Sequence, residues 1–183
     1  MQVKYFKISG PMLFNIDSYQ DHRGKFSELF NQKDFEPFIK QEFKQDNISY
    51  SKSNVVRGLH YQEQSPQGKL MYCLKGKIID VAVDIRKGSS TFGQYVSVML
   101  EEHNLQAFYV PPGFAHGFAV HQDHDAVILY KCTTLYQKQF DRVLLWDSMN
   151  INMPDNFINK ENIIMSEKDH KGTDISKING VIL

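Results

Sequence analysis

A histidine and an arginine three residues apart are the first candidates for chemistry in this sequence. The string RGLHYQ places the imidazole of His60, which can exchange a proton near neutral pH, close to the guanidinium of Arg57, which can grip a phosphate group. A lone histidine in a strand is more often structural, but an arginine is a poor core residue. Strict alternation would put the two side chains on opposite faces of a strand, so their cooperation requires a bulge at Gly58.

A second histidine follows a rigid turn. His116 stands in PPGFAHGF, which looks like the second motif of cupin barrels, where such a histidine often binds a metal. A metal-binding cupin also needs two close histidines and a carboxylate in its first motif, and RGLHYQ supplies only His60. Two histidines are too few ligands for a typical catalytic site, and His121 and His124 are expected in a solvated loop. We therefore expect no metal.

Two tyrosines, a lysine and an aspartate are the other candidate reactive groups. Tyr130 and Tyr136 are an even number of residues apart, so one continuous strand would present them on the same face, although both rings could simply be core residues. Lys69, at the start of a predicted strand, would usually be solvated, but inside a cavity it could stabilise a developing oxyanion. Asp169, in SEKDH, has the local composition of a surface residue.

Two polar strings nearer the N-terminus are too rich in hydrogen-bonding groups for an ordinary strand surface. DHRGKFSELF carries Arg23 and Glu28 beside a turn glycine. QDNISYS has Gln45, Asn47 and Ser49 on one parity, so these three side chains can point the same way. Both strings are candidate binding segments.

These side chains need a scaffold, and the hydrophobic pattern predicts one made of short strands. In residues 77–86, Ile79, Val81, Val83 and Ile85 alternate with other residues, which is typical of a strand with one buried and one polar face. Further strands are predicted at residues 55–62, 69–75, 95–100, 107–110, 117–122 and 126–136. Many short strands separated by turns favour a sandwich or barrel.

Helical signal is confined to two short segments. Residues 34–41 could form one short helix with Pro37 in its first turn, and residues 159–165 could hold another turn or two. We therefore predict an all-β fold with minor short helices, in a single domain over residues 1–183.

Composition narrows the class of protein. The 183 residues include 21 Lys plus Arg and 21 Asp plus Glu, and this lack of basic excess argues against a nucleic-acid or anionic-membrane partner. No apolar run approaches the roughly 18 residues of a membrane span, and the N-terminus lacks the apolar core of a secretory leader. Cys73 and Cys132 lie in apolar runs and are expected to be buried free thiols. A cytoplasmic protein is expected.

Six strings in order resemble the dTDP-4-dehydrorhamnose 3,5-epimerase family: RGLHYQ, QGKL, DVAVDIRKGSSTFGQ, PPGFAHGF, LYKCTT and SEKD. With DHRG before them, the resemblance covers about residues 21–169. It implies a cupin-like jelly-roll β-barrel that forms a homodimer and needs no metal or other cofactor. It also implies a dTDP-linked 4-keto-6-deoxy sugar as the substrate, epimerised at carbons 3 and 5 through an enolate.

The resemblance further implies a role for each candidate residue. His60 would remove the proton next to the 4-keto group, with Asp169 holding its imidazole, and Tyr130 would deliver a proton from the opposite face. Lys69 would stabilise the enolate oxygen. The residues that the resemblance assigns to substrate binding are Arg23, Glu28, Gln45, Asn47, Arg57, His116, Tyr136, Asp141 and Lys168.

The sequence departs from the family pattern near the expected rim of the substrate site. Lys25 and Phe26 stand where the family usually has an aromatic pair, Asp141 stands in for a usual acidic residue, and INMPD replaces a tryptophan-proline string. These departures leave open a mono-epimerase acting at carbon 3 or carbon 5. More distant functions are those of a ketoisomerase, against which RGLH and Asp169 argue, a metal-dependent cupin enzyme, and a sugar-nucleotide-binding barrel without activity.

Overall fold

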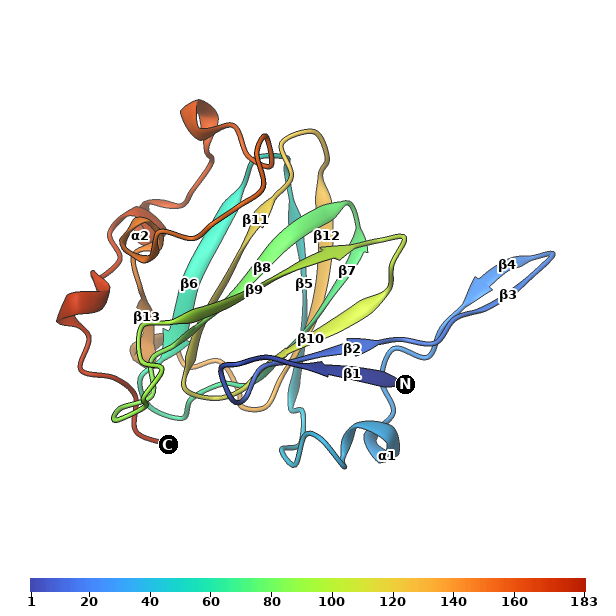
Figure 1. The fold of residues 1–183 in the computed structure, drawn as a ribbon, viewed down its shortest axis with the longest axis horizontal. Helices are drawn as coiled ribbons and strands as arrows, with labels where there is room; N and C mark the ends of the chain where they lie inside the picture. Colours follow the sequence, from blue (N-terminus) through green and yellow to red (C-terminus); the bar gives the residue numbers. More distant parts are fainter.

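Two antiparallel sheets face each other in the computed structural model, which describes residues 1–183 (Figure 1). One sheet has six strands in the order β1 (Gln2–Tyr5), β2 (Met12–Asn15), β10 (Gln106–Val110), β7 (Lys69–Lys75), β12 (Ala126–Cys132) and β5 (Gln45–Ser51). The other has five, in the order β13 (Asp141–Val143), β6 (Val56–Gln62), β11 (Phe114–Val120), β8 (Lys77–Asp84) and β9 (Tyr95–Glu101). The predicted all-β fold is confirmed.

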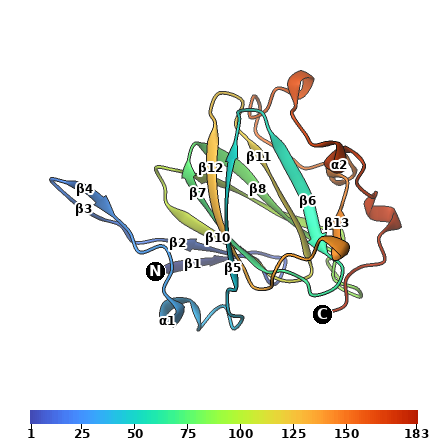
Figure 2. The ribbon, with the colours of Figure 1, turned by 180° about the vertical axis from the view of Figure 1, so that it is seen from behind.

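A separate hairpin leaves the barrel near the N-terminus. Its strands β3 (Tyr19–Asp21) and β4 (Gly24–Phe26) pair only with each other, and both views show it extending away from the two sheets (Figures 1 and 2). All six of its strand residues are exposed. The hairpin therefore contributes nothing to the core of its own chain.

The space between the sheets holds the main hydrophobic core. Phe108 and Ile128 enter it from the six-stranded sheet, and Phe114, Phe118 and Val96 enter it from the five-stranded sheet. Each such side chain contributes roughly 1.5–3 kcal/mol when fully buried. This packing holds the facing sheets together and fixes which side chains can project into the remaining interior.

Strand β8 corrects one prediction about burial. The expected polar face does not exist, because every residue from Ile78 to Asp84 is buried. Val81 and Val83 pack outside the sheet against the C-terminal part of the chain, whereas Ala82 faces the interior between the sheets. The small or polar residues of this strand are thus enclosed by the opposite sheet rather than solvated.

Most predicted strands match the structure to within one or two residues, but the strand predicted at residues 117–122 is β11, which runs from Phe114 to Val120. Residues 69–75 coincide with β7, and the predicted strands at 55–62, 95–100 and 107–110 each differ from the structure by one residue at one end. The prediction of one strand over residues 126–136 was wrong, because β12 ends at Cys132. Tyr130 and Tyr136 therefore do not share a strand. The short strands β1 to β4 and β13 were not predicted.

Helices are few and short. The segment predicted as a helix at residues 34–41 holds only α1 (Gln32–Phe35), whose first turn is capped by the side chain of Asn31. A second helix, α2 (Glu167–His170), was not predicted and is capped by Ser166. The remaining turns are 3₁₀ segments: η1 (Lys138–Phe140), η2 (Trp146–Met149), η3 (Lys160–Asn162) and η4 (Ile175–Lys177). None of these helices has the length and apolar composition needed to cross a membrane.

The C-terminal part of the chain covers the outer face of the five-stranded sheet (Figure 1). Trp146, Phe157 and Val181 bury their side chains there against the odd-numbered residues of β8. Parallel bridges from Thr173 to Leu144, and from Val181 to Arg86 just after β8, tie the segment down. This covering places α2 beside β6, where its side chains can reach the interior.

Candidate active site

A bulge in β6 brings two predicted site residues to the same side of the sheet. On β11, His116 pairs with His60 and Phe118 pairs with Arg57, so two steps along β11 match three along β6. Gly58 lies inside this bulge at φ +104°, and a Cβ there would come within 2.7 Å of the carbonyl oxygen of His116. The bulge that the sequence required is confirmed, and Arg57 and His60 line one cavity.

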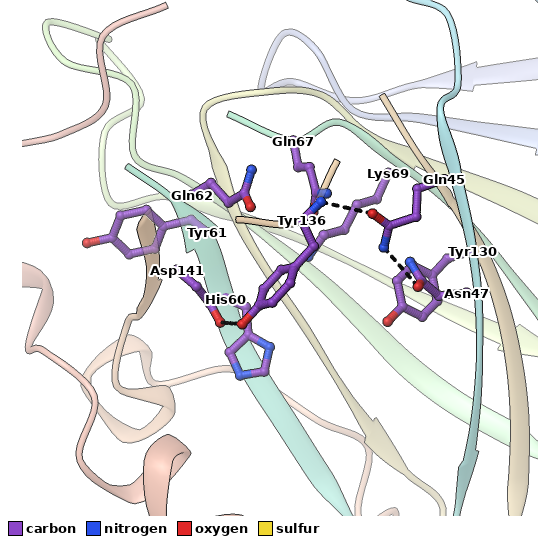
Figure 3. A pocket seen from close by; sticks show the side chains of 10 residues that line it. All are labelled: Gln45, Asn47, His60, Tyr61, Gln62, Gln67, Lys69, Tyr130, Tyr136 and Asp141. Carbon is purple, nitrogen blue, oxygen red and sulfur yellow. Dashed lines mark hydrogen bonds between the residues drawn. The ribbon is translucent and has the colours of Figure 1, made fainter. Parts of the chain in front are cut away.

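This cavity opens where the edge of one sheet approaches the edge of the other (Figure 3). Its outer part has a volume of about 300 Å³ and its inner part about 120 Å³, and the two share His60, Lys69 and Tyr130. The outer part is also lined by Gln45, Asn47, Tyr61, Gln62, Gln67, Tyr136 and Asp141. The inner part adds Ser49, Arg57, Met71, His116, Gly117 and Phe118.

His60 is held by a buried carboxylate. Its Nε2 lies 2.7 Å from Oδ1 of Asp169, whose other oxygen accepts the backbone N–H of Gly58 at 3.2 Å. Asp169 is only 3% exposed, so the expectation of a surface residue was wrong. Its burial alone would raise the pKa of Asp169, but the hydrogen bonds from His60 and Gly58 outweigh that effect and lower the pKa. The carboxylate can therefore orient His60 throughout the neutral range.

Lys69 is a half-buried cation with no fixed partner. It stands at the start of β7, and its ammonium group makes no hydrogen bond and no salt bridge within the chain. Burial lowers the pKa of Lys69, and the carboxylates of Asp141 and Asp80 act in the opposite direction. An unpaired donor facing a cavity is suited to stabilise negative charge that develops on a bound molecule.

Tyr130 approaches the cavity from the wall opposite His60 (Figure 3). It lies on β12, opposite Asn47 of β5, whereas His60 belongs to the facing sheet. The phenol makes no hydrogen bond within the chain, and burial raises the pKa of Tyr130. A protonated phenol and an imidazole on opposite walls can act on the two faces of one ring.

His116 forms a second, deeper pair with a carboxylate. Its Nε2 lies 2.6 Å from Oδ1 of Asp80, and both side chains are almost completely buried. Burial lowers the pKa of His116, Asp80 opposes that shift, and the nearby charges of Lys69 and His60 reinforce it. No group of three or more His, Cys, Asp and Glu side chains is arranged to hold a metal ion.

A loop residue stands at the mouth of the cavity. The hydroxyl of Tyr136 donates to Oδ2 of Asp141 at 2.7 Å, and Lys168 pairs with the same oxygen. The hydrogen bond to Asp141 is the main cause that raises the pKa of Tyr136 to about 12. The backbone N–H of Tyr136 donates to Oε1 of Gln45 at 2.8 Å, and Gln45 in turn donates to Asn47 at 2.9 Å. Tyr136 reaches the cavity through these contacts and not through strand periodicity.

Two predicted binding residues lie outside this cavity in the single chain. Arg23 sits on the β3–β4 hairpin with its side chain 79% exposed and paired with Asp21 at 2.6 Å. Glu28 accepts a hydrogen bond from Asn31 near α1 and lines none of this cavity. A single chain therefore does not bring Arg23 and Glu28 to this cavity, and the hairpin that carries Arg23 points away from the barrel (Figure 2).

Comparison with known proteins agrees with this geometry. The model of the dTDP-4-dehydrorhamnose 3,5-epimerase family matches residues 5–177. The chain belongs to this family. The enzyme of that name from Shigella flexneri is 45% identical over 177 residues, covering 94% of each chain. The one from Methanothermobacter thermautotrophicus is 41% identical over 163 residues, covering 88% of each chain.

A solved structure shares the fold of this epimerase-family chain. The crystal structure of dTDP-6-deoxy-D-glucose-3,5-epimerase from Legionella pneumophila Philadelphia 1, in complex with dTDP-4-keto-L-rhamnose, is similar with a TM-score of 0.91 at 38% identity. The match covers 97% of this chain and 94% of that one. The predicted cupin-like barrel of the epimerase family is thereby confirmed.

The roles of two residues at or beside this epimerase-family site were not predicted from the sequence. Gln62 is 4% exposed, accepts the N–H of Gln137 at 2.6 Å and donates to the carbonyl of Ser65 at 2.9 Å, so it fastens the loop that carries Tyr136. Asp80 belongs, by strand alternation alone, to a polar face. In both cases the sequence offered one local indication. A polar residue lies in a strand whose other residues are largely apolar, so the strand itself is expected to be buried.

Proposed function

We propose that this protein converts dTDP-4-keto-6-deoxy-D-glucose into dTDP-4-keto-L-rhamnose by inverting carbons 3 and 5. The observation that carries the proposal is the arrangement of one cavity: His60, backed by Asp169, lies on one wall and Tyr130 on the opposite wall. Inversion at carbon requires a base on one face of the sugar and an acid on the other. The named relatives act in this class of reaction.

The first step is proton removal by His60. The 4-keto group acidifies the hydrogens on carbons 3 and 5, because loss of either proton gives an enolate. Since Nε2 of His60 lies against the carboxylate of Asp169, that nitrogen carries the hydrogen and Nδ1 keeps the lone pair that accepts the substrate proton. The carboxylate also stabilises the imidazolium that results.

The second step is stabilisation and reprotonation of the enolate. The unpaired ammonium of Lys69 supplies positive charge to the enolate oxygen without first breaking another contact. Tyr130 then delivers its phenolic proton from the opposite face, which inverts the carbon. A sugar that displaces water from the inner cavity would strengthen the interaction between Lys69 and the enolate oxygen.

Substrate binding is proposed for polar residues around the mouth and walls. Arg57, whose Nε donates to Ser51 at 2.9 Å, retains other guanidinium donors for the diphosphate. The other members of the proposed binding set are Gln45, Asn47, His116, Tyr136, Asp141 and Lys168.

We also propose that two copies of the chain share this site. The β3–β4 hairpin exposes Tyr19 and Phe26 by 67% and 68%, which a monomer has no reason to leave in water. A hairpin that reaches a second copy would bring Arg23 and Glu28 to the nucleotide there. Light scattering at micromolar concentration should give a dimer; a monomer would contradict this arrangement.

We further propose a cytoplasmic location. Two free buried thiols, Cys73 and Cys132, fit this location, since thiols stay reduced there.

Incubation with dTDP-4-keto-6-deoxyglucose in D₂O tests the reaction. Mass spectrometry and proton NMR of the sugar should show deuterium at carbons 3 and 5 with both centres inverted. Deuterium at a single carbon would replace the proposal with a mono-epimerase. Binding without any exchange would identify a sugar-nucleotide-binding barrel instead.

A further inference from the structure

The loop that carries Tyr136 makes almost no hydrogen bonds with other backbone groups. Residues 134–136 take part in none, although the strands on either side of the loop, β12 and β13, are paired along their length. Backbone N–H and C=O groups that are covered by protein need partners, because leaving them unpaired is costly. The partners of this loop are side chains, and three of them are glutamines.

Gln62 ties the loop to the strand that carries His60. Its Oε1 accepts the N–H of Gln137 at 2.6 Å, and its Nε2 donates to the carbonyl of Ser65 at 2.9 Å. The side chain is only 4% exposed, so water does not compete strongly for these bonds. Because the carbonyl of Ser65 can only accept, it holds Nε2 on its side and turns Oε1 toward the loop.

Two further glutamines hold the loop from other elements. Nε2 of Gln67 donates to the carbonyl of Thr134 at 2.6 Å, and Oε1 of Gln45 accepts the N–H of Tyr136 at 2.8 Å. Gln45 lies on β5, Gln62 on β6 and Gln67 in the turn before β7, and all three line the outer part of the cavity (Figure 3). This glutamine clamp (Gln45, Gln62 and Gln67) therefore shapes the loop from the walls of the cavity.

We propose that Gln62 and Gln67 are positioning residues whose amides hold residues 134–137 so that Tyr136 stands at the cavity mouth before the substrate arrives. Tyr136 is 51% exposed, so packing alone does not fix its place. A loop that is ordered in advance loses less conformational entropy on binding, and the sugar nucleotide therefore binds more tightly. The gain in affinity rests on the proposed function, whereas the ordering of the loop does not.

The direct test is hydrogen exchange at the amide of Tyr136, followed by ¹H–¹⁵N NMR in the substrate-free full-length protein. This N–H donates to Gln45, so neither Gln62→Met nor Gln67→Met removes its own partner. Methionine has nearly the length of glutamine but lacks the amide. If the glutamine clamp acts as a unit, each change should still speed exchange at Tyr136 about tenfold, as expected for the loss of a hydrogen bond that orders the loop.

Gln139→Met is the matched control. Gln139 follows the same loop and is exposed, and its amide donates to the side chain of Gln137 rather than to a backbone group. Exchange at Tyr136 should match wild type in this variant. If Gln62→Met and Gln67→Met exchange no faster than the control, the glutamine clamp is refuted. If Gln62→Met does not fold, Gln67→Met, which loses a single contact, decides the question.

Kinetics extend the test to substrate binding. With dTDP-4-keto-6-deoxyglucose, each variant should raise KM about tenfold and change kcat much less, because His60, Lys69 and Tyr130 are untouched. In a Tyr136→Ala background the same changes should add little to KM, since the group that they position is gone. An unchanged KM with a lower thermal unfolding midpoint would assign both glutamines to stability alone and overturn the proposal. Faster exchange at Tyr136 in a protein that converts no substrate would refute the proposed function and leave the ordering of the loop intact.

Discussion

His60 and Asp169 meet at 2.7 Å although 109 positions separate them in the chain. The contact exists because the C-terminal segment folds back over the outer face of the five-stranded sheet and sets α2 beside β6. Ser166 caps that helix by accepting the N–H of Asp169 at 3.1 Å, so the position of the carboxylate is set by its own helix start. The orientation of the proposed base, His60, therefore depends on a segment outside the barrel.

Replacement of His60 should remove the reaction and leave the fold in place. We expect His60→Ala to lower kcat by at least about 10²-fold, since general base catalysis typically contributes 10²–10⁴-fold. Its loss also leaves Oδ1 of the buried Asp169 carboxylate without a partner, so we expect a lower thermal unfolding midpoint but a folded protein. His103→Ala, at a side chain that is 88% exposed, is the control for loss of a histidine. Full activity in His60→Ala would show that His60 is not the general base.

Tyr130→Phe should separate two steps that normally occur together. Deuterium exchange into the substrate should continue, because His60 still removes the proton, while formation of the inverted product falls far more. Tyr50→Phe, at an exposed tyrosine on β5, serves as the control for loss of a phenol. Equal losses of exchange and product would show that Tyr130 only binds the sugar.

Gly58→Ala should destroy the geometry of the bulge. The added Cβ would lie 2.7 Å from two backbone atoms of β11, and φ is +104°, so both strand pairing and backbone conformation resist the change. We expect a loss of at least about 2 kcal/mol, which lowers the unfolding midpoint by roughly 4–8 °C in a domain of this size, together with loss of activity. Gly88→Ala is the matched control, since Gly88 also has positive φ but nothing lies within 4 Å of its Cβ position. A midpoint equal to that of Gly88→Ala would contradict the role of the close approach.

Acid should destabilise the turn after β8 over a defined pH range. Burial alone would raise the pKa of Asp84, but hydrogen bonds from Arg86, Ser89 and Thr91 lower it to about 2. A carboxyl whose pKa is lowered in the folded state contributes stability above its unfolded pKa of about 3.9, and this stability is lost as pH falls toward 2. Asp84→Asn should therefore be less stable than wild type at pH 7, with a smaller difference at pH 2. Denaturant titrations at both pH values measure this, and an equal difference at both would contradict it.

The sequence alone predicted the local features of this structure. Apolar runs located β7 to within a residue, and two cysteines within such runs were correctly expected as buried free thiols. The residue types of RGLHYQ and the order of its companion strings indicated the family, which the comparisons confirm. Strand alternation also predicted that Arg57 and His60 could share one face of the sheet only if the strand has a bulge at Gly58. This prediction was possible because the alternation of side chains is a property of the backbone itself.

Only the tertiary structure decided which polar groups are enclosed. Asp169 has the composition of a surface residue and Asp80 the spacing of a polar strand face, yet both are buried because other layers of the chain cover them. Tyr136 reaches the site through a loop anchored by Gln45, and Arg23 lies on a hairpin outside the barrel. Sequence periodicity reports how side chains alternate about one strand, whereas burial depends on what a distant part of the chain, or a second copy, places over each face.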